Sequence, residues 1–193
     1  MPTFVAAEKT GDERGALLAF LEAQRGGIRR SVHGLTEEQA RSTPSASTLS
    51  LSALLKHVAV VEENWLRTAL EQPAELTEAD MQRFQDSFVP HEDETVQALL
   101  DRHAAAAAAV DEAVRAQPSL DDTFRTPKAP WGEADRRSWR WLVLHLVEEI
   151  ARHAGHADII RETVDGKGAF DLVFETGAAK APDAWDTGES AGA

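Results

Sequence analysis

The sequence predicts an all-α protein folded as a four-helix bundle, with a long loop before the last helix and a short C-terminal tail. Four long segments carry apolar residues at the spacing of an amphipathic helix: 12–33, 50–70, 92–117 and 137–164. We find no convincing series of strand patterns in the sequence. Helices with one apolar face each bury that face by packing against one another. The 193 residues are enough for one such compact domain.

The first two long helices have recognisable start and stop signals. The first extends from about Asp12 to His33 and is followed by Gly34, a residue type that commonly ends helices. Residues 36–39, TEEQ, have the form of a capping box and open a short helical segment. The second long helix covers residues 50–70, after a loop rich in serine, threonine and proline.

A polar connector with room for a short helix, TEADMQRFQDSF, leads to the third helix at residues 92–117. Residues 118–136 then form a long loop that contains three prolines. Long loops in compact domains are often functional, so Trp131 in this loop is a candidate pocket wall. The fourth helix ends at Asp165 and Gly166. The bundle therefore occupies residues 1–166. For the tail, residues 167–193, we expect the stretch AFDLVF to pack on the bundle or to form a short strand. We expect the end of the tail to be frayed.

Composition narrows the classes of function. The formal charge is −13, with 33 acidic against 20 basic residues, which argues against nucleic acid and against a polybasic membrane surface as partners. The chain has no cysteine, so disulfides, thiolate metal ligands and a cysteine nucleophile are excluded. No basic start followed by an apolar run is present, and no apolar stretch approaches the roughly 18 residues of a membrane span. We therefore expect a cytoplasmic protein that acts on a small-molecule substrate. A homodimer is compatible with the predicted fold.

The stretch EEIARHAGH in the fourth helix holds the most informative polar residues. On a helical wheel at roughly 100° per residue, His153 falls within the apolar arc and Glu149 falls at its edge. His145 and His156 lie on the adjoining flank. Three polar residues point to water instead: Glu148, Arg152 and Asp158.

An inward carboxylate is costly unless it is paired or bound to a metal. Glu149 can form an ion pair with His153, or each can bond a Ser, Thr or backbone group. His57 offers a third candidate, because it lies at the edge of the apolar stripe of the second helix. A lone histidine there is usually structural, but two imidazoles and one carboxylate from facing helices make the three-ligand set of a catalytic zinc site.

For the other polar and aromatic residues, the sequence favours a structural role over a functional one. Glu62 also lies on the apolar stripe of the second helix, where a salt bridge to an arginine of a neighbouring helix is favoured over orienting a ligand histidine. Tryptophans in helices are more often packing anchors than substrate platforms. Three histidines lack an inward partner pattern and are expected at the surface: His33, His91 and His103.

The strings LLKHVAVVEENW and LVLHLVEEIARHAGHADIIRETVDG resemble the DinB/YfiT-like superfamily of metal-binding four-helix bundles. They are most similar to its actinobacterial branch, related to mycothiol-dependent maleylpyruvate isomerases, whose last helix reads close to H-x-x-E-E-x-x-R-H-x-G-H-x-D-x-x-R-E-x-x-D-G. The similarity covers most of residues 12–166. The resemblance does not imply DNA binding.

The resemblance implies that His57, Glu149 and His153 are the metal ligands. Many members of the superfamily present three histidines, whereas the maleylpyruvate isomerases have glutamate at the first position of the last-helix pair. His156 takes a place where relatives often have glutamine. His145 or His156 could replace Glu149 as a ligand, although the cost of an unpaired inward carboxylate favours Glu149.

Three functions are compatible with this site. A divalent metal, with zinc favoured and nickel, iron or manganese compatible, could lower the pKa of a thiol such as mycothiol for an S-transferase or isomerase reaction on a small electrophile. His156 and His145 are then the candidates for acid–base catalysis. The alternatives are a metal-dependent hydrolase and a non-catalytic metal- or small-molecule-binding protein of stress response or resistance.

Overall fold

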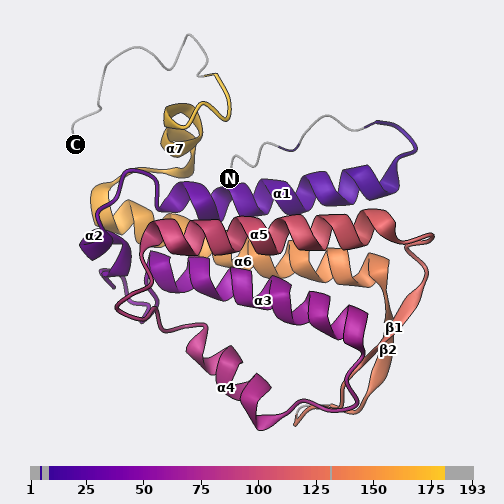
Figure 1. Ribbon diagram of the computed structural model, residues 1–193. Coiled ribbons are helices and arrows are strands. Elements are labelled where there is room, and N and C mark those ends of the chain that lie inside the picture. The colour runs from indigo at the N-terminus through magenta and orange to yellow at the C-terminus, as the bar shows by residue number, and fades with distance from the viewer. Residues whose placement is uncertain (1–4, 6–8, 131, 181–193) are drawn as a thin grey trace.

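The computed structural model describes residue 5 and residues 9–130 and 132–180. It is mostly helical, which confirms the all-α class. The long helices α1 (Glu13–Ser31), α3 (Leu51–Glu71), α5 (Val96–Ala116) and α6 (Trp139–Asp165) lie side by side (Figure 1). Around them lie the short helices α2 (Glu37–Arg41), α4 (Glu78–Asp86) and α7 (Ala169–Glu175). Helix α6 packs against both α1 and α3, and α5 packs against α3.

The helix boundaries follow local capping chemistry. Ser50 and Ser138 precede α3 and α6, and each side chain accepts a hydrogen bond from the backbone N–H three residues later. Thr36 and Thr77 form capping boxes at the starts of α2 and α4. Helix α6 ends at Gly166, whose φ of 81° lies in the left-handed region that glycine adopts without strain. Because these signals are local, the ends of the four long helices predicted from the sequence lie within a few residues of those observed.

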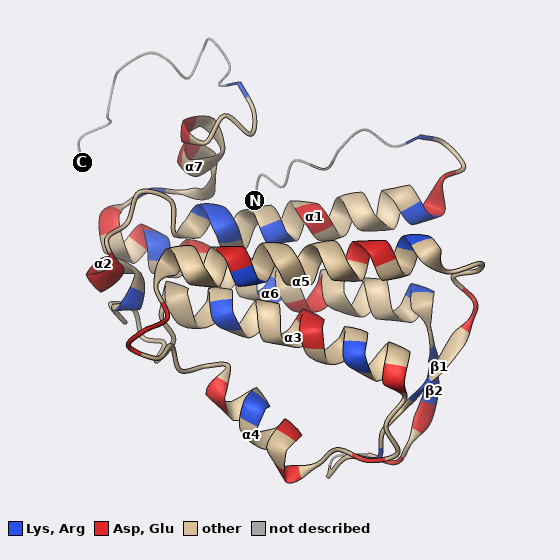
Figure 2. Ribbon diagram, in the orientation of Figure 1, with Lys and Arg blue, Asp and Glu red and all other residues tan. Residues whose placement is uncertain are grey.

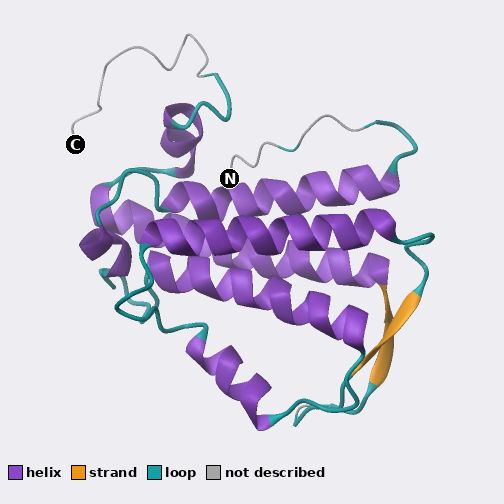
Figure 3. Cartoon of the chain, viewed as in Figure 1, coloured by secondary structure: helices purple, strands orange, loops and turns teal. Residues whose placement is uncertain are grey.

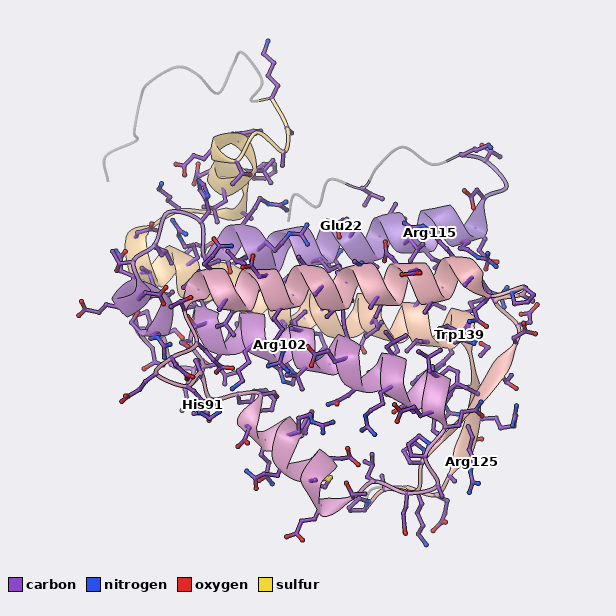
Figure 4. The ribbon with its side chains drawn as sticks, viewed as in Figure 1. Glu22, His91, Arg102, Arg115, Arg125 and Trp139 are labelled. Carbon is purple, nitrogen blue, oxygen red and sulfur yellow. The ribbon has the colours of Figure 1, made fainter. Side chains whose placement is uncertain are left out.

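A two-stranded sheet corrects the prediction for the segment before α6. Strands β1 (Thr123–Thr126) and β2 (Asp135–Ser138) pair antiparallel, with Thr123 opposite Ser138 (Figure 3). Their sequences, TFRT and DRRS, are short and polar, and only Phe124 is buried, so no alternating pattern marks them. Trp139, labelled in Figure 4, lies where β2 passes into α6 and contacts the ring of Phe124. The hairpin therefore fixes where α6 begins.

The tail packs as a helix rather than as a strand. Leu172 and Val173 of α7 are buried, and α7 packs against α1. The frayed end predicted for the chain lies outside the described residues, as does Trp131.

The core combines an apolar interior with a buried ion-pair network centred on Arg25. The largest apolar side chains that are less than 2% exposed are Phe124, Leu21, Ile28, Leu51, Leu54, Leu55, Leu99, Leu142, Leu146 and Ile150. Arg25 of α1, fully buried, donates from Nε to Glu62 of α3 at 2.8 Å and from Nη1 to Asp111 of α5 at 2.8 Å. The salt bridge predicted for Glu62 is thus confirmed. It ties three of the long helices together.

Acidic and basic residues are interspersed along the long helices (Figure 2). Within the described part of the chain, no helix is both long and apolar enough to cross a membrane.

Candidate metal centre

Helix α6 brings Glu149 and His153 together on one face. They lie one turn apart, and His153 Nε2 lies 3.2 Å from Glu149 Oε1. The side chain of Glu149 is 27% exposed, whereas that of neighbouring Glu148 is 63% exposed. The two glutamates therefore differ in orientation as the helical wheel predicts, because successive residues on a helix point about 100° apart.

His57 reaches the same place from α3. Its side chain is 1% exposed, its Nε2 lies 3.6 Å from Glu149 Oε1, and its ring centroid lies 4.7 Å from that of His153. One potential ligand atom from each of His57, Glu149 and His153 lies within 4.8 Å of the others. The structure thus brings together the three residues that the sequence places on two different helices.

The charge states of Glu149 and His57 suit the binding of a cation. The hydrogen bond from His153 holds the pKa of Glu149 well below its usual range, so its carboxylate is ionised at neutral pH. Burial lowers the pKa of His57, which keeps that imidazole neutral. Among the described residues, the ion pairs of Glu149 involve these two imidazoles and no lysine or arginine. An ionised carboxylate beside the neutral imidazole of His57 offers two of the donors that a divalent metal binds.

The segment TEADMQRFQDSF, predicted only as a polar connector with room for a short helix, completes the surroundings of His57. Phe88 stacks on the His57 ring at a centroid distance of 4.0 Å, and Phe84 of α4 meets it edge-on at 5.7 Å. Ser87 Oγ lies 2.8 Å from His57 Nδ1. Nothing in the polar string TEADMQRFQDSF indicates these contacts, because they depend on how α4 packs against α3.

Comparison with known proteins agrees with this geometry. A family model described as mycothiol-S-transferase matches residues 16–166, a segment that contains all three residues of the triad. The chain belongs to the mycothiol-S-transferase family. This bears out the resemblance to the DinB/YfiT-like superfamily.

One solved structure, described as the crystal structure of the conserved protein of locus from Enterococcus faecalis, gives a TM-score of 0.56 at 18% identity. The match covers 83% of this chain and 100% of that one. At this identity the likeness concerns the fold alone. A comparison with curated proteins finds no match.

In this mycothiol-S-transferase family member, His145 lies one turn before Glu149 in an aromatic cluster. Its ring stacks on Trp141 at 4.9 Å and meets Trp65 edge-on at 4.8 Å. Burial lowers the pKa of His145, so its imidazole is neutral. Arg137 lies 5.2 Å from the centre of the Trp141 ring. The cluster therefore fixes the orientation of His145 beside the triad.

His156 lies on the other side of the triad along α6. It is partly buried, and burial followed by the nearby His153 lowers its pKa. Within the described residues, neither His156 nor His145 belongs to the group of potential ligand atoms within 4.8 Å of one another. Both histidines therefore lie outside the candidate group of metal ligands.

Two polar residues differ from their predicted positions. His103 is predicted at the surface, but it is 0% exposed on α5, and neither of its ring nitrogens has a hydrogen-bond partner among the described residues. The six alanines and one valine that follow it give no sign of which face of α5 is covered. Asp158, expected in water, is partly buried, and that burial raises its pKa.

Proposed function

We propose that this chain is a metal-dependent S-transferase that uses mycothiol, or a thiol of that type, to attack a small electrophile. The observation that carries the proposal is the convergence of His57, Glu149 and His153 within 4.8 Å of one another in a chain of the mycothiol-S-transferase family. The side-by-side arrangement of α1, α3, α5 and α6 supports a four-helix bundle of the DinB/YfiT type as the scaffold.

We infer that His57 and His153 would hold the metal through Nε2 and that Glu149 would hold it through its carboxylate. Three protein ligands with both nitrogen and oxygen donors favour zinc, and nickel, iron or manganese accept the same donors. A bound divalent ion of this kind offers an open position to a thiol and stabilises its thiolate at neutral pH.

The residues around the triad would prepare the reaction. Glu149 supplies the negative charge that balances the cation, while Phe84 and Phe88 keep water from one side of His57. His145 is neutral and held by two tryptophans, so its Nε2 can accept the thiol proton and later return it to the product. His156 is the second candidate for this proton transfer.

The absence of cysteine is consistent with this chemistry. With no thiol of its own, the chain must receive its reacting sulfur from a co-substrate. Thiolate attack on the electrophile would lead to S-transfer, or to isomerisation if the thiol is released again. Both outcomes need the same first step.

The ligand assignment is tested by metal content. Wild-type protein purified without added metal should carry about one divalent ion per chain, and Glu149→Ala should lose most of it. Glu148→Ala is the matched control, because this neighbour is 63% exposed and points away from the triad. Equal metal content in the two variants would contradict the assignment.

The thiol assignment is tested by activity with model electrophiles. Turnover should require mycothiol and should fall when His145 is replaced by alanine. Metal-dependent hydrolysis that proceeds without thiol would overturn the transferase proposal, and so would metal binding without any thiol-dependent reaction.

A further inference from the structure

The turn that follows α4 makes an unusual contact with the candidate metal centre. Helix α4 lies outside the bundle of four long helices (Figure 1), where it packs against α3 and has no buried residue of its own. The residue that follows it, Ser87, is 0% exposed. Its hydroxyl lies 2.8 Å from His57 Nδ1 and 2.6 Å from the carbonyl oxygen of Phe84. This hydroxyl is thus shared between one ring nitrogen and one backbone oxygen.

The number of available protons determines which atom donates in each of the two hydrogen bonds of the Ser87 hydroxyl. A carbonyl oxygen can only accept, so Ser87 Oγ–H must be the donor to Phe84. A hydroxyl has a single proton, and its oxygen can therefore only accept from His57. The Nδ1 of His57 must carry a hydrogen to complete the bond. In a neutral imidazole this leaves the lone pair on Nε2.

We propose that Ser87 is a positioning residue that fixes the Nδ1–H tautomer of His57 and turns the Nε2 lone pair toward Glu149 and His153. The proposal rests on the proposed metal site for its functional meaning. A histidine ligand needs a free lone pair on the binding nitrogen, and a hydrogen bond from its other nitrogen holds the ring in place. Here the hydrogen-bond acceptor is a serine hydroxyl anchored to the backbone of α4.

The surroundings of His57 leave the Ser87 hydroxyl as the main acceptor for the proton on Nδ1. The side chain is 1% exposed, and Phe88 covers one ring face at a centroid distance of 4.0 Å. Water therefore has little access to Nδ1 as a replacement acceptor. Without the Ser87 hydroxyl, the proton can move to Nε2, where Glu149 Oε1 lies 3.6 Å away. That tautomer would block the nitrogen that faces the other two ligands.

The α4 segment has other anchors, so the role of Ser87 can be tested alone. Arg67 of α3 donates to Asp80 of α4 at 2.6 Å. Lys56 of α3 donates to the carbonyl oxygen of Val89 at 2.9 Å, just beyond the turn. These bonds do not involve the Ser87 hydroxyl. A Ser87→Ala variant should therefore keep α4 in place.

The test combines nitrogen NMR with zinc affinity. Long-range proton–nitrogen spectra of metal-free wild-type protein should show His57 as the Nδ1–H tautomer, and Ser87→Ala should shift it toward Nε2–H. Zinc affinity, measured by competition with a chromophoric chelator, should fall about 10- to 100-fold in Ser87→Ala. Ser87→Thr keeps the hydroxyl and should preserve the tautomer and restore most of the affinity.

Ser52→Ala is the matched control. Ser52 is also buried, on α3 itself, but its hydroxyl has no hydrogen-bond partner among the described residues. Its replacement should change neither the tautomer nor the affinity.

An Nε2–H tautomer in the wild-type protein would overturn the proposal, and so would Ser87→Ala spectra and affinity equal to wild type. The failure of the metal site is a separate result. If wild-type protein binds no divalent metal, the proposed function is wrong, and the tautomers of the two metal-free proteins still decide the assignment of Ser87.

Discussion

His103 should make the stability of this protein depend on pH in a way that one substitution removes. The side chain is 0% exposed on α5, and both ring nitrogens lack a partner among the described residues. Burial, followed by the positive charges of Arg29 and Arg25, lowers the pKa of His103 to about 3. In the unfolded chain its pKa returns to about 6.5.

The sign follows from proton binding. Below pH 6.5 His103 binds a proton in the unfolded chain but stays unprotonated in the folded chain, so acid favours unfolding. The contribution of His103 is fully present above about pH 6.5 and is lost progressively as the pH falls toward about 3. With these two pKa values, the free energy of unfolding should fall by about 2 kcal/mol between about pH 7.5 and pH 5 from this group alone.

Urea unfolding followed by circular dichroism measures this effect. His103→Leu replaces the ring with an apolar side chain of similar volume and removes two unpaired polar atoms. The pH-dependent loss should shrink by about 2 kcal/mol in this variant, because the other titrating groups act equally in both proteins. His33→Leu, at an exposed histidine, is the control and should keep the wild-type loss. If His103→Leu and wild type lose the same stability over this pH range, His103 is not held neutral by burial.

Three further predictions follow from other contacts. Glu62→Gln should lower the free energy of unfolding in urea by about 3 to 5 kcal/mol, because it leaves buried Arg25 without its main counter-charge. Glu63→Gln is the control, since Glu63 forms a half-exposed pair with Arg102, and it should lower the same free energy by about 1 kcal/mol or less. Equal losses in the two variants would contradict this reasoning. Ser138→Ala removes the hydrogen bond to the backbone N–H of Trp141 and should lower the free energy of unfolding by about 1 kcal/mol, whereas no change would show that β2 alone starts α6. Trp141→Ala uncovers His145, so the pKa of that imidazole should rise toward its ordinary value in an NMR titration, and an unchanged pKa would show that the stacked ring does not cause the shift.

Much of the helical scaffold is encoded locally, which is why the sequence predicts it well. Ser50, Ser138 and Gly166 mark helix ends through bonds and backbone angles that involve only neighbouring residues. The inward orientation of Glu149 follows from helix geometry in the same way. The salt bridge of Glu62 was predictable because a buried carboxylate requires a cationic partner.

The features that sequence reasoning missed depend on contacts between distant segments. Ser87 acquires its role only when α4 packs beside α3, and nothing in its local sequence distinguishes it from a solvent-exposed serine. The β1–β2 hairpin is polar and short, so its pairing leaves no periodic pattern. His103 lies beside a run of alanines, which are compatible with either face of a helix. In each case the missing information is which neighbour covers the residue.

X-ray absorption at the metal edge tests the central claim most directly. The chain has no cysteine, so the metal-loaded protein should show nitrogen and oxygen neighbours, including the scattering pattern of two imidazoles, and no thiolate sulfur. Addition of mycothiol should then introduce one sulfur neighbour at about 2.3 Å if the metal is zinc. A first shell without histidine would contradict the assignment of His57 and His153 as ligands. A histidine-containing shell that gains no sulfur would contradict the thiol-activating function.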